Sequence, residues 1–104
     1  MIAVRERLAN RRASEVFDLE LNGLHYTVTF SRFGDGRIAE VFIQNSKPGS
    51  TSDCYARDAA IAASLALQHN CPLQTLRRAL LRDPQGRPQT PLGAAIDRLA
   101  GDES

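Results

Sequence analysis

The strongest structural signal in the chain is the dipeptide Asn22-Gly23, which stands between two stretches of alternating apolar and polar residues. Apolar side chains take every second position over residues 17–21 and again over residues 24–31. A two-residue type I′ turn needs positive φ at both central positions, and asparagine and glycine tolerate this best. The pattern therefore predicts an antiparallel hairpin with one apolar face that another layer must cover.

Residues 38–44 are predicted to form a third strand beside this hairpin. The segment is apolar apart from Glu40, and its β-branched residues Val41 and Ile43 favour extended backbone. The turn-forming pair Asp35-Gly36 comes just before it, so the chain can reverse direction again. The first half of the chain is therefore expected to be a three-stranded antiparallel meander.

The second half of the chain is predicted to be helical and to cover the apolar face of the sheet. Helices are expected over residues 53–70, 73–82 and 91–100. Pro91 suits the first turn of the third helix, and Gly101 is expected to end it. Strands followed by helices indicate an α+β two-layer sandwich, here a three-stranded meander, two main helices and a short C-terminal helix.

The long first helix carries six alanines, and its inward face is expected to hold Cys54, Ile61 and Leu65. Small side chains allow close approach to the sheet, and alanine has the best intrinsic helix propensity. The predicted core is drawn from all three strands and all three helices. It consists of Phe17, Leu19, Leu21, Tyr26, Val28, Phe30, Val41, Ile61, Leu65, Leu76, Leu80, Ile96 and Leu99.

The length of 104 residues predicts a single domain. We expect a basic mobile arm over residues 1–14, a single domain over residues 15–101 and a frayed tail over residues 102–104. No apolar run approaches the ~20 residues that cross a bilayer, so a cytoplasmic location is expected and no membrane partner. The 13 basic and 12 acidic residues leave a net charge of +1, which argues against a dedicated DNA clamp.

Catalytic chemistry has little support in the sequence. The only histidines are His25 and His69, and neither stands at metal-ligand spacing with cysteines or acidic residues. Cys54 and Cys71 form no C-x-x-C pair. Cys54 lies fifteen positions from His69 on one predicted helix, and at ~1.5 Å per residue this separation exceeds ~20 Å, so the two cannot form a nucleophilic Cys-His pair. We therefore expect no enzyme activity, no metal and no cofactor.

One loop has the composition of an anion site. Lys47, Gly49, Ser50 and Thr51 precede the long helix and can offer backbone N–H groups, hydroxyls and a cation to a nucleotide or other anion. The alternative is that Ser52 or Asp53 caps the helix, and an aspartate there would also repel an anion.

The arginines suggest a weaker alternative. Arg77, Arg78 and Arg82 can form a basic ridge, with Arg11 and Arg12 of the arm as further contacts for single-stranded nucleic acid. The balanced net charge argues against such binding, because phosphate contacts dominate the affinity.

Four segments together resemble the TSCPD domain family. They are DGRIAEVFI at residues 35–43, KPGS at 47–50, SLALQH at 64–69 and PLQTL at 72–76, and the likeness covers about residues 15–100. Those domains occur at the C-terminal end of adenosylcobalamin-dependent ribonucleotide reductases and as small stand-alone bacterial and phage proteins. The naming motif Thr-Ser-Cys-Pro-Asp has no copy here, and QTPLG at residues 89–93 stands where it would fall, without the cysteine.

The resemblance implies an accessory or interaction domain linked to ribonucleotide reduction or nucleotide metabolism. It implies a protein partner or self-association, with a small-ligand module as the alternative. It does not imply that this chain reduces a substrate, because a reductase barrel and its cysteines are absent from the sequence.

Overall fold

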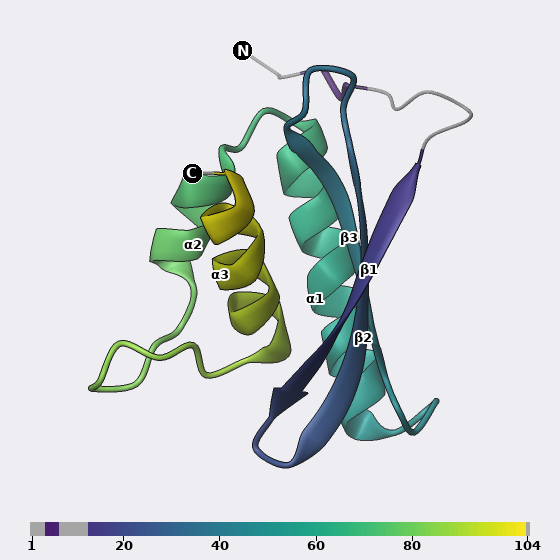
Figure 1. Ribbon diagram of the computed structural model, residues 1–104, viewed down its shortest axis with the longest axis vertical. Helices are drawn as coiled ribbons and strands as arrows, with labels where there is room; N and C mark the ends of the chain where they lie inside the picture. Colours follow the sequence, from purple (N-terminus) through teal and green to yellow (C-terminus); the bar gives the residue numbers. More distant parts are fainter. Residues whose placement is uncertain (1–3, 7–12, 104) are drawn as a thin grey trace.

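The computed structural model describes residues 4–6 and 13–103 and shows an antiparallel sheet followed by helices (Figure 1). The strands are β1 (Ser14–Leu21), β2 (Leu24–Arg32) and β3 (Ile38–Asn45), in the spatial order β1-β2-β3. The helices are α1 (Thr51–Gln68), α2 (Leu73–Ala79) and α3 (Pro91–Glu103). This confirms the predicted α+β fold.

The hairpin between β1 and β2 closes as its sequence predicts. Asn22 and Gly23 have φ values of 53° and 79°, both in the left-handed region, and Leu21 pairs with Leu24 across the turn. The register that follows places Phe17 opposite Val28, so the Phe17 ring and the Val28 methyl groups lie on the same face of the sheet.

A bulge in β3 lets one strand contribute more side chains to the core than strict alternation allows. Ser31 pairs with Glu40 but Arg32 pairs with Ile38, so Ala39 is an extra residue on β3. As a result Ile38 and Val41, which are three positions apart, both belong to the buried cluster.

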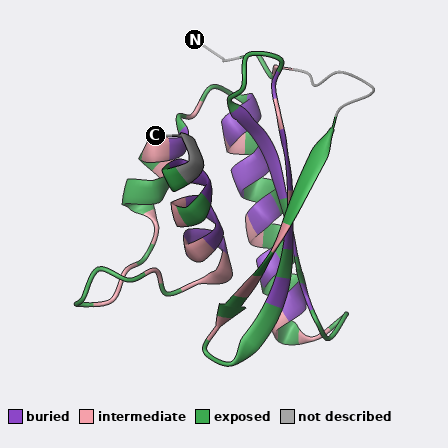
Figure 2. Ribbon diagram, viewed as in Figure 1, coloured by how far each residue is buried: buried purple, intermediate pink, exposed green. Residues whose placement is uncertain are grey.

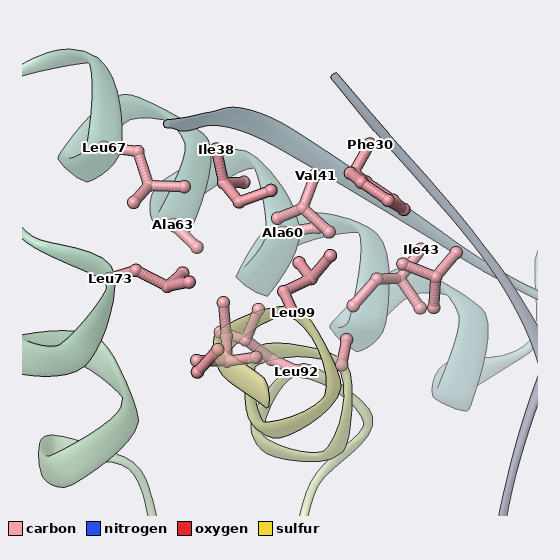
Figure 3. Close-up of a cluster of buried hydrophobic side chains, with 14 of the residues drawn as sticks. Phe30, Ile38, Val41, Ile43, Ala60, Ala63, Leu67, Leu73, Leu92 and Leu99 are labelled. Atoms are coloured by element: carbon pink, nitrogen blue, oxygen red, sulfur yellow. The ribbon is translucent and has the colours of Figure 1, made fainter. Parts of the chain in front are cut away.

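The core lies between β2 and β3 on one side and α1 and α3 on the other (Figure 3). Leu92 and Leu99 of α3 point toward Val41 and Ile43 of β3, beside the alanines of α1 (Figure 3). The prediction is confirmed for most of its residues. Tyr26, Val28, Phe30, Val41, Ile96 and Leu99 are buried, and Phe17, Leu19, Leu21, Leu76 and Leu80 are partly buried against them.

The predicted inward face of the long helix is wrong. The side chains of Ile61 and Leu65 are 51% and 42% exposed, and Cys54 is exposed as well. The inward face of α1 carries small and polar residues, so the ribbon is buried on one side and exposed on the other (Figure 2). Its buried residues are Asp53, Ala56, Ala60, Ala63, Ser64, Leu67 and Gln68.

The helix boundaries also differ from the prediction. α1 begins at Thr51 instead of residue 53, and α2 ends at Ala79 instead of residue 82. Gly101 does not end the third helix, because α3 continues to Glu103. The left-handed residue after α1 is Asn70, with φ of 70°, as its sequence position before Pro72 indicates.

The predicted basic arm falls largely outside the described residues, and Arg11 and Arg12 lie there. Its described part contacts the end of α1. Arg5 Nε donates to Gln68 Oε1 at 2.6 Å, and the Glu6 N–H donates to the Gln68 carbonyl oxygen at 2.7 Å. Residues 4–6 therefore lie against the C-terminal end of α1.

Candidate functional site

The loop between β3 and α1 forms a tight helix cap. Ser50 has extended backbone (φ −68°, ψ 162°), and its Oγ accepts the Asp53 N–H at 3.2 Å. Ser50, one turn before Asp53, is therefore the N-cap, so the predicted caps Ser52 and Asp53 are wrong. Gly49 reaches this turn with φ of 79°, a backbone conformation that glycine adopts without strain.

Asp53 is the buried centre of this loop. The residue is only 1% exposed. Its two carboxylate oxygens accept the Asn45 N–H at 2.9 Å and the Gly49 N–H at 3.0 Å. Arg57 lies one turn along α1, with its Nη1 3.6 Å from Asp53 Oδ2. The hydrogen bonds from Gly49 and then Asn45 hold the pKa of Asp53 below its ordinary value, because they favour the ionised carboxylate.

This geometry places a carboxylate where an exogenous anion would bind. The loop does bring Lys47, Gly49, Ser50 and Thr51 together within one turn, with Lys47 and Thr51 exposed. However, the Gly49 N–H already donates to the Asp53 carboxylate, and the Ser50 Oγ already accepts the Asp53 N–H. The loop therefore works chemically as a helix cap with its own internal anion.

Asn45 sits at the start of the same loop. Its Oδ1 accepts the Lys47 N–H at 2.8 Å, which fixes the orientation of the side-chain amide. The buried Nδ2 has no hydrogen-bond partner within the described part of the chain. An unpaired buried donor costs about 1–3 kcal/mol, so this amide is a weak point of the cap.

The predicted arginine ridge is mostly occupied by an ion-pair cluster around Asp97. Arg77 Nε is 3.2 Å from Asp97 Oδ1, and Arg82 Nη1 donates to Asp97 Oδ2 at 2.9 Å. The bonds from Arg82, followed by those from Arg77, lower the pKa of Asp97. Arg78 is exposed beside them. Two of the three ridge arginines thus fasten α2 and the following segment to α3.

Open hollows lie on the surface of the described part of the chain, and two of them bear on function. One, of about 440 Å³, is bordered by Asp18, Glu20, His25 and Ser46, with His25 Nδ1 3.8 Å from Glu20 Oε2. Across residues 4–6 and 13–103, no group of three histidine, cysteine or acidic residues could hold a metal ion. Among the same residues no helix is long and apolar enough to cross a membrane.

The second hollow, of about 350 Å³, was missed by the sequence analysis. It lies between the β2–β3 loop and the start of α2, with Phe33, Arg37 and Cys71 among its lining residues. Arg37 stacks on Phe33, with Cζ 4.6 Å from the ring centroid, and its guanidinium also pairs with Asp35 and Glu6. Nothing in the spacing of these residues indicates that they meet.

The curated relatives that share part of this sequence include three proteins named vitamin B12-dependent ribonucleotide reductase. The protein from Agrobacterium fabrum is 39% identical over 70 residues, which is 67% of this chain. The proteins from Bradyrhizobium diazoefficiens and Streptantibioticus cattleyicolor are 32% identical over 69 residues and 33% identical over 72 residues.

The matched region is a small part of each relative. It spans 6% of the first two reductases and 12% of the third. No protein-family model matches the chain. No solved structure is significantly similar to it.

Proposed function

We propose that this chain, which is related to a segment of vitamin B12-dependent ribonucleotide reductases, is a non-catalytic accessory domain that acts through contact with another protein. The observation that carries the proposal is the length of the match. About two thirds of this chain corresponds to only 6% of the first two relatives, so the similarity is to a small segment of each reductase.

The fold supports a domain that works as a unit. Its sheet and helices bury a continuous core, which includes Val28, Val41, Ile96 and Leu99 at no measurable exposure. A segment of this size that forms its own core can fold apart from a larger enzyme and bind to it. A cytoplasmic location and a bacterial or phage origin are part of the proposal.

The segment that stands in place of the TSCPD naming motif supports a structural role. Thr90 Oγ1 accepts the Gly93 N–H at 3.1 Å, and the Thr90 carbonyl oxygen accepts the Ala94 N–H at 3.0 Å. These bonds start α3 at Pro91, so residues 89–93 serve as a helix cap in this chain.

An anion site at Lys47, Gly49, Ser50 and Thr51 is the alternative proposal. The buried carboxylate of Asp53 argues against it, because that group takes up the Gly49 N–H. Single-stranded nucleic-acid binding by the arginine ridge is weaker still, since Asp97 neutralises much of the charge of Arg77 and Arg82.

The test uses the Agrobacterium fabrum reductase with its matched 70-residue segment deleted. We expect this chain, added in trans, to bind the shortened reductase in biolayer interferometry, and to replace the deleted segment when fused in its place. The matched control is the chain with Ile96→Asp, which puts a charge into a fully buried position and should abolish both results.

Two outcomes would contradict the proposal. One is a folded fusion protein that is no more active than the deletion, together with no binding in trans. The other is ribonucleotide reduction by the isolated chain supplied with adenosylcobalamin and a dithiol.

A further inference from the structure

β1 is an edge strand, and most of its outward backbone groups are unpaired. The sheet order β1-β2-β3 gives it one neighbour, and the two-residue turn after Leu21 sets which groups face that neighbour. By alternation the N–H and carbonyl groups of Val16, Asp18 and Glu20 point away from β2. In the described part of the chain, only Arg98 bonds to them, at the Asp18 carbonyl oxygen. Such a row of donors and acceptors is a template for one more strand.

The two faces of this edge differ in chemistry. Asp18 and Glu20 are exposed on the outer face of the sheet, away from the helices. Phe17, Leu19 and Leu21 are half-buried on the inner face, packed against the core. A strand added to β1 would therefore place alternate side chains beside carboxylates on one face and beside apolar groups on the other.

The negative charge on the outer face is not neutralised within the described chain. Glu15, at the start of β1, is paired with Arg32 at 3.3 Å, but no arginine or lysine among the described residues pairs with Asp18 or Glu20. These two carboxylates and His25 border the hollow of about 440 Å³. A long basic side chain that stands next to either carboxylate has room in this hollow.

We propose that β1 is the docking edge for an extended segment of the partner protein, one that carries lysine or arginine at every second position and apolar residues between them. The basic side chains lie next to Asp18 and Glu20 on the outer face, and the apolar ones cover Leu19 on the inner face. The inner face does not take basic side chains, because the Arg98 guanidinium already lies there, 4.1 Å from the centroid of the Phe17 ring.

The charge of the edge argues against two other occupants. A second β1 would bring Asp18 and Glu20 close to carboxylates of the same kind, and like charges on neighbouring strands are destabilising. A nucleic acid would bring its phosphates against the same two carboxylates. A basic strand gains from the charges that repel both of these, so the edge selects it by attraction and by exclusion.

An NMR titration tests this inference with a blocked eight-residue peptide that alternates lysine and valine. At about 50 mM salt, where exposed charges are weakly screened, we expect a dissociation constant of roughly 0.1–1 mM, because a short peptide loses its conformational freedom on binding. The control peptide has the same composition with lysines and valines in two separate blocks. It keeps the charge but cannot match the two faces, and it should bind at least about tenfold more weakly.

Hydrogen exchange in the complex separates strand addition from simple charge attraction. The N–H groups of Val16 and Asp18 point outward, so an added strand should slow their exchange at least about tenfold. A peptide held only by its lysine side chains would leave these amides unprotected.

Charge reversal provides a matched pair of variants. Asp18→Lys should weaken binding of the alternating peptide about fivefold, and adding Glu20→Lys should weaken it further. Asp58→Lys makes the same change on the exposed side of α1, which packs on β3, and should leave the affinity within about twofold of the wild type. Circular dichroism of these variants should match the wild type, because the three positions are exposed.

Three results would each overturn the proposal. They are equal binding of the two peptides, unchanged exchange at Val16 and Asp18 in the complex, and an Asp18→Lys chain that binds the peptide as tightly as Asp58→Lys does.

The inference rests on the proposed role in protein contact but fails separately from it. If Asp18→Lys with Glu20→Lys bound the shortened reductase as tightly as the wild type, the accessory role would stand and β1 would not be the docking edge. If the alternating peptide added to β1 but the chain did not bind the reductase, the docking edge would stand and the role beside the reductase would fail.

Discussion

Along the outer edge of β3, side chains of α1 bind backbone groups that the strand ladder leaves unpaired, whereas along β1 the described residues supply only Arg98. Ser64 Oγ accepts the Val41 N–H and donates to the Val41 carbonyl oxygen, each at 2.9 Å. Gln68 Nε2 donates to the Ala39 carbonyl oxygen at 3.2 Å. At β1, Arg98 Nη1 reaches the Asp18 carbonyl oxygen at 3.4 Å.

The comparison shows two ways to protect the edge of a sheet. β3 is closed by a helix that brings polar side chains within hydrogen-bond distance of the strand, and its alanines permit that approach. β1 is left more exposed and carries three acidic residues, which discourage pairing with a similar strand. Closing an edge with a helix therefore requires polar residues on the helix face that would normally be apolar.

Hydrogen exchange should show the largest difference between the two edges. In the antiparallel ladder the N–H groups of Val41 and Asn45 point away from β2, and so do those of Val16 and Asp18 on the other edge. Only the first pair is held by α1, through Ser64 and Asp53. We expect those two amides to exchange about 10³-fold or more slowly than the β1 pair. Equal rates measured by NMR would mean that α1 does not close the edge.

Removing one polar group from each edge should give the next largest difference. Ser64→Ala leaves the buried N–H and carbonyl group of Val41 without partners, so we expect a loss of about 2–4 kcal/mol in the free energy of unfolding. Arg98→Ala removes one long hydrogen bond and a cation–π contact with Phe17 at 4.1 Å, which we expect to cost about 0.5–1 kcal/mol.

Urea denaturation of both variants measures these losses. Ser52→Ala is the control on α1, because it removes a half-buried hydroxyl that makes no hydrogen bond to β3 among the described residues, and it should cost under about 0.5 kcal/mol. If Ser64→Ala cost no more than Arg98→Ala, the two edges would be equivalent in stability and the comparison would fail.

The sequence predicts the open edge and the hairpin better than the closed edge. Asn22-Gly23 fixes a local turn, and the alternation around it fixes which side chains face the core. The inward face of α1 depends instead on a non-local requirement, the unpaired backbone of β3. Hydrophobicity alone places Ile61 and Leu65 inside, whereas Ser64 and Gln68 are there because they bind Val41 and Ala39.

The candidate site shows the same limit. The composition of the loop correctly indicates a helix N-terminus. It is compatible with two alternatives, a helix cap and an anion site. Which one forms depends on Asp53, whose carboxylate binds the N–H of Gly49, four residues earlier, and the N–H of Asn45, eight residues earlier. Likewise, Arg82 and Arg77 bind Asp97, which lies 15 and 20 positions further along the chain. No local sequence pattern indicates pairs with such a separation.

Acid should weaken the closed edge through Asp53. Its pKa is below the ordinary value in the folded chain, so its stabilising effect is complete above pH ~4 and is lost as the pH falls through the folded-state pKa. We expect the free energy of unfolding to decline below pH ~4. Asp53→Asn should be less stable at pH 7 and should decline less steeply.

Some decline should remain in Asp53→Asn, because the pKa of Asp97 is also lowered, chiefly by Arg82. Urea denaturation at pH 7, 5, 4 and 3 gives the two curves. If they ran parallel, Asp53 would contribute nothing to the acid sensitivity, and its bonds to Asn45 and Gly49 would not differ in strength between its charged and neutral forms.

The smallest effect is expected at the end of the closed edge, where the loop carries the exposed Lys47. Ser50→Ala removes the cap of α1 and should cost about 1 kcal/mol, whereas Lys47→Ala changes only an exposed side chain and should stay within about 0.5 kcal/mol of the wild type. Because Asp53 occupies the Gly49 N–H, we also expect no measurable binding of inorganic phosphate by calorimetry in either the wild type or Lys47→Ala.

A different result at Lys47 would change the interpretation of the whole loop. A charge-assisted hydrogen bond contributes ~1.5–3 kcal/mol, so a true anion site would lose roughly ten- to a hundredfold in phosphate affinity on Lys47→Ala. Phosphate would then have to displace the Asp53 carboxylate from Gly49, and that displacement would also free the Asn45 N–H at the end of β3. Phosphate binding should therefore speed hydrogen exchange at Asn45 while leaving Val41 protected by Ser64, and this pattern separates a ligand-binding loop from a permanent cap.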